Sequence, residues 1–153
     1  HCRQDEMCAA GAGESLLRDP ARLCEYVRAA AGTGAAVSVK VRTELGGVDL
    51  SDVAARLDAA GAALLPVDAR DSERVVADVV AATDAAVIAN NGVRDAATVR
   101  EYLDHGADAV SVGRPSDDPR VLRRVREATE AWFAERSGDD LEARSTTRPE
   151  GSP

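Results

Sequence analysis

The sequence predicts an α/β fold built on a parallel sheet, and three observations support that prediction. Short apolar runs alternate four times with amphipathic stretches along the chain, which is the pattern of consecutive strand–helix units. The connections between them are short and rich in glycine and polar residues. The apolar runs are also nearly continuous, as is typical of parallel strands that are covered on both faces.

The first part of the chain is expected to form a loop, a helix and a strand. Residues 1–13 end in a glycine-rich turn and read as a loop. Residues 14–31 place leucine, tyrosine and valine along one helical face. Pro20 is expected to break or restart this helix, because proline lacks the N–H that a helix interior needs. Valines at alternate positions over residues 37–42 then favour a strand.

The middle of the chain continues the alternation. Gly61 and Gly106 are expected to end two of its helices, since glycine readily adopts the left-handed conformation that follows a helix. In order, the elements are a helix from Asp49 or Ser51 to residue 60, a strand over 62–67, a helix over 72–82, a strand over 85–89, a helix over 95–105 and a strand over 109–112.

The C-terminal part divides into a helix and a tail. Residues 119–135 form an amphipathic pattern, whose expected buried side consists of Val121, Leu122, Val125 and Trp132. Residues 137–153 are polar and rich in charge, glycine and proline, so we expect a disordered tail there.

Composition limits the classes of protein that this chain can represent. A length of 153 residues suffices for one ordinary core. The net charge of −8 opposes generic binding of polyanions. Acidic residues are abundant and arginine almost wholly replaces lysine, which suggests a halophilic protein from a high-salt cytoplasm. The three cysteines lack paired metal-type spacing. Because the sequence begins with histidine, we expect it to be a piece of a longer chain.

Lys40 is the only lysine in the sequence. The period of two along a strand places Lys40 on the same face as Ser38 and opposite the valines. In a parallel β/α barrel that face points into the barrel. An ammonium group there needs an anion or an electron-rich ligand, because an unpaired buried charge is very costly. The alternative is a solvated strand end.

Polar residues and glycines follow the predicted strands repeatedly. Parallel connections bring the carboxyl ends of strands to one rim, where ligands bind. Glycine-bearing loops after the last two strands predict a phosphate site there, because small residues let backbone amides approach an anion. The residues expected on the rim are Lys40, Arg42, Asp68, Arg70, Asn90, Asn91, Gly92, Gly113 and Arg114.

Four motifs occur in order along about residues 1–130. They are Cys2 followed by residues 11–17 (GAGESLL), residues 37–42 (VSVKVR), residues 87–92 (VIANNG) and residues 106–114 (GADAVSVGR). In these motifs the chain resembles the C-terminal half of the flavin barrels of tRNA-dihydrouridine synthases, with dihydroorotate dehydrogenase-like proteins as close relatives. The resemblance implies strands 5–8 of a (β/α)₈ barrel, with residues 1–136 as a partial flavin-binding barrel and 137–153 as the tail.

The resemblance also implies roles for individual residues. Lys40 would lie against the FMN ring and stabilise negative charge at the N1–C2=O edge of the reduced flavin. Cys2 would be the acid that protonates C5 of uracil. Members carry His-Gly-Arg where this chain has Asp68-Ala69-Arg70. The cofactor-binding set that the resemblance implies is Lys40, Asp68, Arg70, Asn90, Asn91, Gly92, Gly113 and Arg114.

The function implied by the resemblance is that of an FMN-dependent oxidoreductase. It would reduce the C5–C6 double bond of uracil, with NADH or NADPH as electron donor, in the cytoplasm. Members end in a helical RNA-binding domain, whereas this chain ends in an acidic tail, so whether the pyrimidine is carried in tRNA stays open. The alternatives are a dihydroorotate dehydrogenase-like reductase of a free pyrimidine and a non-catalytic phosphate-binding half barrel. We expect the chain alone to be inactive and to self-associate.

Overall fold

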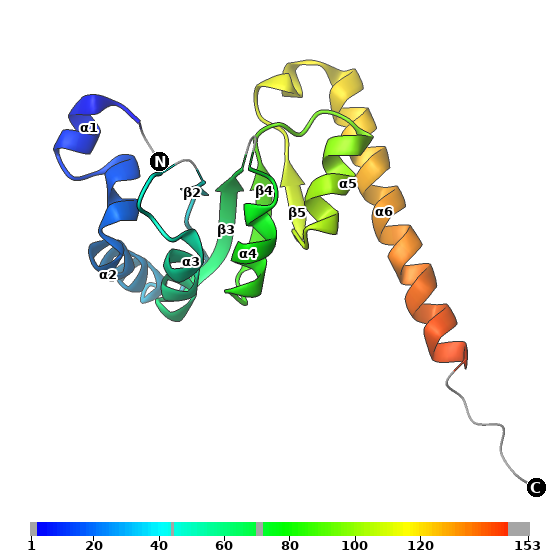
Figure 1. The fold of residues 1–153 in the computed structure, drawn as a ribbon, viewed down its shortest axis with the longest axis horizontal. Helices are drawn as coiled ribbons and strands as arrows, with labels where there is room; N and C mark the ends of the chain where they lie inside the picture. The colour runs from blue at the N-terminus through cyan, green and yellow to red at the C-terminus, as the bar shows by residue number, and fades with distance from the viewer. Residues whose placement is uncertain (1–2, 44, 70–71, 147–153) are drawn as a thin grey trace, which may run out of the picture.

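The computed structural model describes residues 3–43, 45–69 and 72–146, with side chains up to residue 137. Its strands form one parallel sheet, which confirms the predicted α/β class (Figure 1). The order along the sheet is β1-β3-β4-β5, and β2 also pairs with β3. The strands are β1 (Val37–Ser38), β2 (Val41–Arg42), β3 (Ala62–Asp68), β4 (Ala86–Asn90) and β5 (Ala109–Ser111).

The helices follow the strands in the same order along the sheet (Figure 1). Pro20 occupies the start of its helix, and Asp49 caps another by accepting from the N–H groups of Ser51 and Asp52. Both positions agree with the sequence pattern, because proline at the first turn and aspartate at the N-cap satisfy or remove donors that lack helical partners. The helices are α2 (Pro20–Ala31), α3 (Leu50–Ala59), α4 (Val75–Ala81), α5 (Ala96–Asp104) and α6 (Pro119–Thr146).

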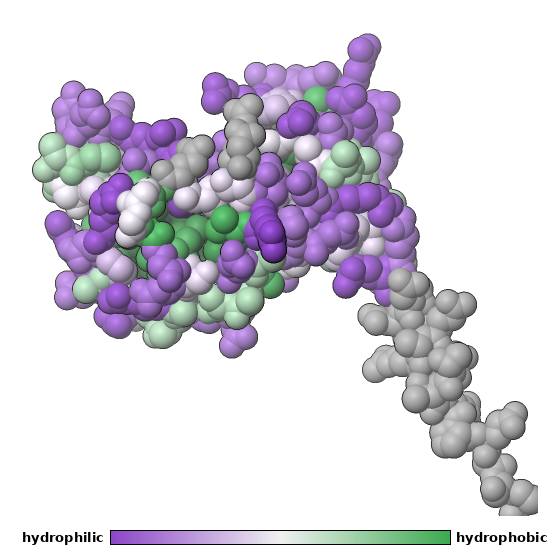
Figure 2. Space-filling model, in the orientation of Figure 1, coloured by the Kyte–Doolittle hydropathy of each residue, from purple (hydrophilic) through white to green (hydrophobic). Residues whose placement is uncertain are grey.

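The two faces of the sheet differ in burial. Leu65, Val67, Val87 and Ala89 point to one face and are 0 to 1% exposed. The alternate residues of β3 and β4 are mostly half-buried, so within the described chain the expectation that both faces are covered is wrong. The arrangement is that of part of a parallel β/α barrel, in which helices cover only the outer face. Figure 2 shows hydrophobic residues reaching the surface around β3, within a largely hydrophilic face.

The N-terminal region and the Lys40 strand depart from the expected elements. Residues 5–9 form a short helix, α1 (Asp5–Ala9), instead of a loop, and its two acidic residues lie in the first turn, where the helix dipole favours them. The predicted helix over 14–31 is divided into a 3-10 helix (Gly13–Arg18) and α2. The predicted strand over 37–42 is divided into β1 and β2, with a register shift between Val37 and Ser38.

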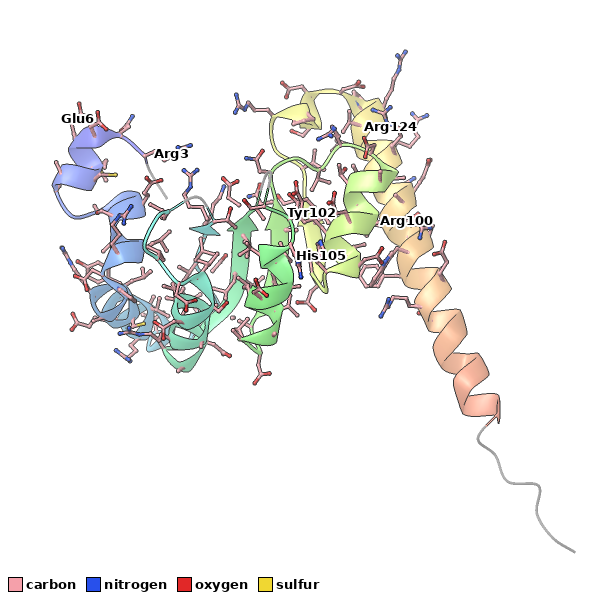
Figure 3. The ribbon with its side chains drawn as sticks, in the orientation of Figure 1. Arg3, Glu6, Arg100, Tyr102, His105 and Arg124 are labelled. Carbon is pink, nitrogen blue, oxygen red and sulfur yellow. The ribbon has the colours of Figure 1, made fainter. Side chains whose placement is uncertain are left out.

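The last helix is longer than its sequence pattern suggests. It continues to Thr146, so residues 137–146 are helical, although they were predicted to belong to a disordered tail. A helix that is already formed extends at little cost, even through poor helix formers. Val121, Val125 and Trp132 are buried as expected, but Leu122 is 43% exposed. The helix is joined to α5 by Arg100, whose guanidinium donates to Glu135 at 2.6 Å (Figure 3).

We expect the 153-residue chain to associate with itself. Strands β1 and β5 end the described sheet on either side, and open strand edges invite pairing. Light scattering should therefore give a mass above that of the 16.0 kDa monomer. Ser38→Lys, which places a charge on the exposed β1 edge, should lower that mass. Ser137→Lys adds the same charge on exposed α6 and should not. A parent chain that stays monomeric across concentrations would contradict this expectation.

Candidate functional site

The strand register brings four residues to one level of the sheet. Arg42 pairs with Asp68, Asp68 with Asn90, and Asn90 with Ser111. Paired positions in parallel strands project to the same face. These residues therefore lie side by side on the inner face, near the carboxyl ends of the strands, which is the rim that the sequence pattern predicted.

A cavity of about 590 Å³ opens at this rim. Its size falls within the range of ligand pockets. Seven of the predicted site residues line it, whereas Cys2 and Arg70 lie outside the described residues. The lining consists of Lys40, Asp68, Asn90, Asn91, Gly92, Val93, Arg94, Gly113, Arg114 and Pro115.

Sequence reasoning missed three of these lining residues. They are Val93, Arg94 and Pro115. Each lies one or two positions after a predicted glycine-bearing loop, so a slightly longer definition of the two loops would have included them. Arg94 is the important omission, because it adds a cation, and its Nη1 donates to the Gly92 carbonyl at 2.9 Å.

The charge of the cavity differs from that of the whole chain. Among the described residues that line it, Lys40, Arg94 and Arg114 are cationic and only Asp68 is anionic, whereas the chain carries a net charge of −8. A local cationic site on an acidic protein attracts an anionic ligand by its nearby charges. The residues that the structure describes contain no group of side chains suited to a metal ion.

The loop after β4 is fixed by hydrogen bonds to both of its neighbours. Asn91 has φ of 74° and Gly92 has φ of 83°. The Asn91 side-chain amide donates to Asp68 Oδ1 at 2.9 Å, and the Tyr102 hydroxyl donates to the Asn91 carbonyl at 2.8 Å. The loop therefore has a defined shape beside the cavity.

The start of α5 is fixed independently of that loop. Asp95 caps the helix by accepting from the Thr98 N–H, and the Thr98 hydroxyl contacts the backbone N–H of Asp95 in return. The hydrogen bond from the Thr98 N–H holds the pKa of the Asp95 carboxyl below its ordinary value. The cap therefore stays ionised at neutral pH and orients the helix behind the loop.

The loop after β5 leaves room for a ligand. A Cβ atom at Gly113 would meet no protein atom within 4 Å, so the packing of this chain does not require glycine there. Arg114 and Pro115 then begin a 3-10 helix (Arg114–Asp117). Arg114 is exposed and lines the cavity, which suits a side chain that contacts a bound anion.

Arg42 connects the N-terminal region to the Lys40 strand. It is 4% exposed, and its Nη1 donates to Glu14 Oε2 at 3.0 Å. Arg3 also approaches this carboxylate, at 3.5 Å. Sequence reasoning missed the contact, because Glu14 and Arg42 are separated by 28 positions and only the fold brings them together.

Lys40 lies between two cavities. It lines the rim cavity and also a neighbouring one of about 320 Å³, which is mostly apolar and includes Leu16, Tyr26 and Val39. Ser38 and Lys40 are exposed while Val37, Val39 and Val41 are half-buried or buried. This alternation agrees with the predicted placement of Lys40 opposite the valines.

The chain is similar to dihydrouridine synthases in sequence. A sequence model of the dihydrouridine synthase family matches residues 2–142. A probable tRNA-dihydrouridine synthase of Rhodobacter capsulatus is 29% identical over 126 residues, which are 74% of this chain and 39% of that protein. The chain therefore spans about two-fifths of the length of this curated relative.

Two solved structures match part of the chain. A cube-shaped, porous protein cage, designed by fusing symmetric oligomeric domains, matches 80% of this chain and 47% of its own at a TM-score of 0.53 and 22% identity. A native KDPGal structure matches 76% of this chain and 56% of its own at 0.49 and 22%. The first likeness concerns the fold alone. No helix among the described residues combines the length and the hydropathy that crossing a membrane requires.

Proposed function

Because this chain belongs to the dihydrouridine synthase family, we propose that it carries the phosphate-binding side of an FMN-dependent oxidoreductase. The reaction is reduction of the C5–C6 double bond of a uracil base, with NADH or NADPH as electron source. The substrate is a pyrimidine within tRNA, a proposal supported by the name of the Rhodobacter capsulatus relative. The single observation that carries the proposal is the cationic rim cavity, lined by both glycine-bearing loops.

The residues present fit the phosphate of FMN. Gly113 leaves open space where a side chain would otherwise project. Arg114 and Arg94 bring guanidinium groups to the same cavity, and charge-assisted hydrogen bonds from arginine to phosphate are among the stronger polar contacts. Asn90 and Asn91 add side-chain amides, which both donate and accept hydrogen bonds. These residues would hold the phosphate end of the cofactor.

The remaining roles concern charge and protons. Bound FMN would supply hydride to C6 of the uracil ring. Lys40 provides a cation at the cavity wall, where it would favour ligands that carry negative charge. Cys2 would hold the proton that is delivered to C5, since a thiol with a pKa near 8.5 is largely protonated at neutral pH. Asp68 and Arg70 would also belong to the cofactor-binding set.

Arg114→Ala is expected to weaken FMN binding. The loss of one charge-assisted hydrogen bond costs about 1.5–3 kcal/mol, or roughly tenfold to a hundredfold in affinity. Titration of FMN fluorescence measures the change. Arg28→Ala removes an exposed arginine on α2 that does not line the cavity, and it should leave the affinity unchanged. Equal effects of the two substitutions would show that Arg114 acts only through the overall charge.

A further inference from the structure

Asn91 holds an unusual backbone conformation. Among the residues that the structure describes, Asn91 is the one residue other than glycine with a positive φ, at 74°. Residues other than glycine visit this region at a cost, and asparagine is tolerated better than most. Backbone strain of this kind persists when surrounding contacts determine it and often occurs at ligand-binding sites. The contacts that hold Asn91 therefore bear on the function of the loop.

Two elements hold Asn91, one through its side chain and the other through its backbone carbonyl. Its side-chain amide donates to Asp68 Oδ1, at the end of β3, over 2.9 Å. Its carbonyl accepts from the Tyr102 hydroxyl over 2.8 Å. Tyr102 is 1% exposed and extends from α5 (Figure 3). A buried phenol has little freedom to move, so it fixes the backbone of the loop.

The same contacts affect the charge of the cavity. Asp68 is the one carboxylate among the described residues lining it, and a carboxylate facing a bound phosphate would repel it. The amide of Asn91 engages this carboxylate with a donor. Tyr102 also lies close behind Gly92, where a Cβ atom would be 3.5 Å from its hydroxyl oxygen. One cluster thus determines both the shape of the loop and the direction of the carboxylate.

We propose that Asp68, Asn91 and Tyr102 form a clasp that fixes the loop over residues 90–92 and makes the cavity selective for a phosphorylated over an unphosphorylated ligand. Tyr102 and Asp68 are positioning residues in this clasp, because they act through Asn91. The ligand class rests on the proposed function, whereas the fixing of the loop does not.

The test compares three substitutions within the clasp with one outside it. Tyr102→Phe removes only the hydroxyl, and Asn91→Gly removes only the amide while keeping the backbone conformation accessible. Asn91→Asp keeps the shape and places a second carboxylate against Asp68. Tyr26→Phe is the matched control, because Tyr26 is the other tyrosine of the chain and its hydroxyl contacts exposed Arg22 instead.

Two measurements are made on each variant. The first is the ratio of the affinities for FMN and riboflavin, which differ by the phosphate. The second is hydrogen exchange of the amides of residues 91–93 without ligand. We expect Tyr102→Phe to lower the ratio about fivefold, the effect of one neutral hydrogen bond. Asn91→Gly should lower it by at least as much, because the lost amide donates to a carboxylate, and Asn91→Asp should lower it further. Exchange should accelerate in these three variants, and Tyr26→Phe should change neither measurement.

The outcomes separate the clasp from the proposed function. Unchanged hydrogen exchange in all three variants overturns the clasp, whatever the change in affinity for FMN. Faster exchange with an unchanged affinity ratio overturns its role in selectivity. If the parent chain itself does not prefer FMN to riboflavin, the proposed phosphate site and the selectivity are both wrong, and hydrogen exchange alone then decides whether the clasp fixes the loop. A general loss of folding would accelerate exchange throughout the sheet as well as at residues 91–93, and in that case the variants that keep the exchange of the sheet unchanged decide the outcome.

Discussion

Glu14→Ala is expected to lower the free energy of unfolding by about 3 kcal/mol, the low end of the range for breaking a buried ion pair. The Arg42 side chain is 4% exposed, and its Nη1 lies 3.0 Å from Glu14 Oε2. Removing the carboxylate takes away the anion that contacts Nη1 of this buried guanidinium. Because Glu14 itself is 22% exposed, water partly compensates, which places the effect at the low end.

Urea denaturation followed by circular dichroism measures this change. Asp52→Ala is the matched control, because Asp52 forms an ion pair with Arg56 four positions along α3 while both side chains are largely exposed. Exposed pairs at this spacing contribute about 0.5 kcal/mol or less. Glu14→Gln should fall between the two, since an amide oxygen still accepts a hydrogen bond. Equal effects of Glu14→Ala and Asp52→Ala would show that the Arg42 contact is solvated in solution.

Lys40→Met is expected to lower the reduction potential of bound FMN. Reduction adds negative charge to the flavin, and a cation on the cavity wall favours the reduced form more than the oxidised form. We expect a fall of about 30–60 mV, equivalent to about 1.4–2.8 kcal/mol for two electrons. In the full-length protein, turnover should slow as well, because hydride is then accepted from the nicotinamide less readily.

A spectroelectrochemical titration of the flavin-loaded protein gives the potential directly. Lys40→Arg is the control that retains the charge, and its potential should stay close to that of the parent. If Lys40→Met leaves both potential and turnover unchanged, Lys40 is a solvated strand end, which is the alternative that the sequence pattern left open.

The sheet and most of its helices could be predicted because their signals are local. β3 and β4 are short apolar runs that end at polar residues, and α5 follows its own cap residue, Asp95. The grouping of Lys40, Asn90 and Arg114 followed from the geometry of parallel strands, which collects strand ends at one rim. Local pattern and topology together therefore sufficed to place much of the candidate site.

The errors arose where distant contacts or context decide the structure. The Glu14–Arg42 ion pair joins segments 28 positions apart, and no local pattern indicates it. Leu122 fits an apolar stripe, yet it is 43% exposed, because burial depends on what packs against α6. β1 and β2 keep the same register on β3, whereas the pairing shifts inside β1, between Val37 and Ser38. This irregularity depends on the partner strand as much as on the valines.

The segment between β4 and α5 has fixed ends. Asn90 is held by pairing with Asp68 and Ser111, and α5 is held by the reciprocal hydrogen bonds of Asp95 and Thr98. Structural change caused by substitutions in between is therefore confined to a few residues beside the cavity. This separation would allow natural variation or directed evolution to alter ligand preference there while the sheet and the helix keep their geometry.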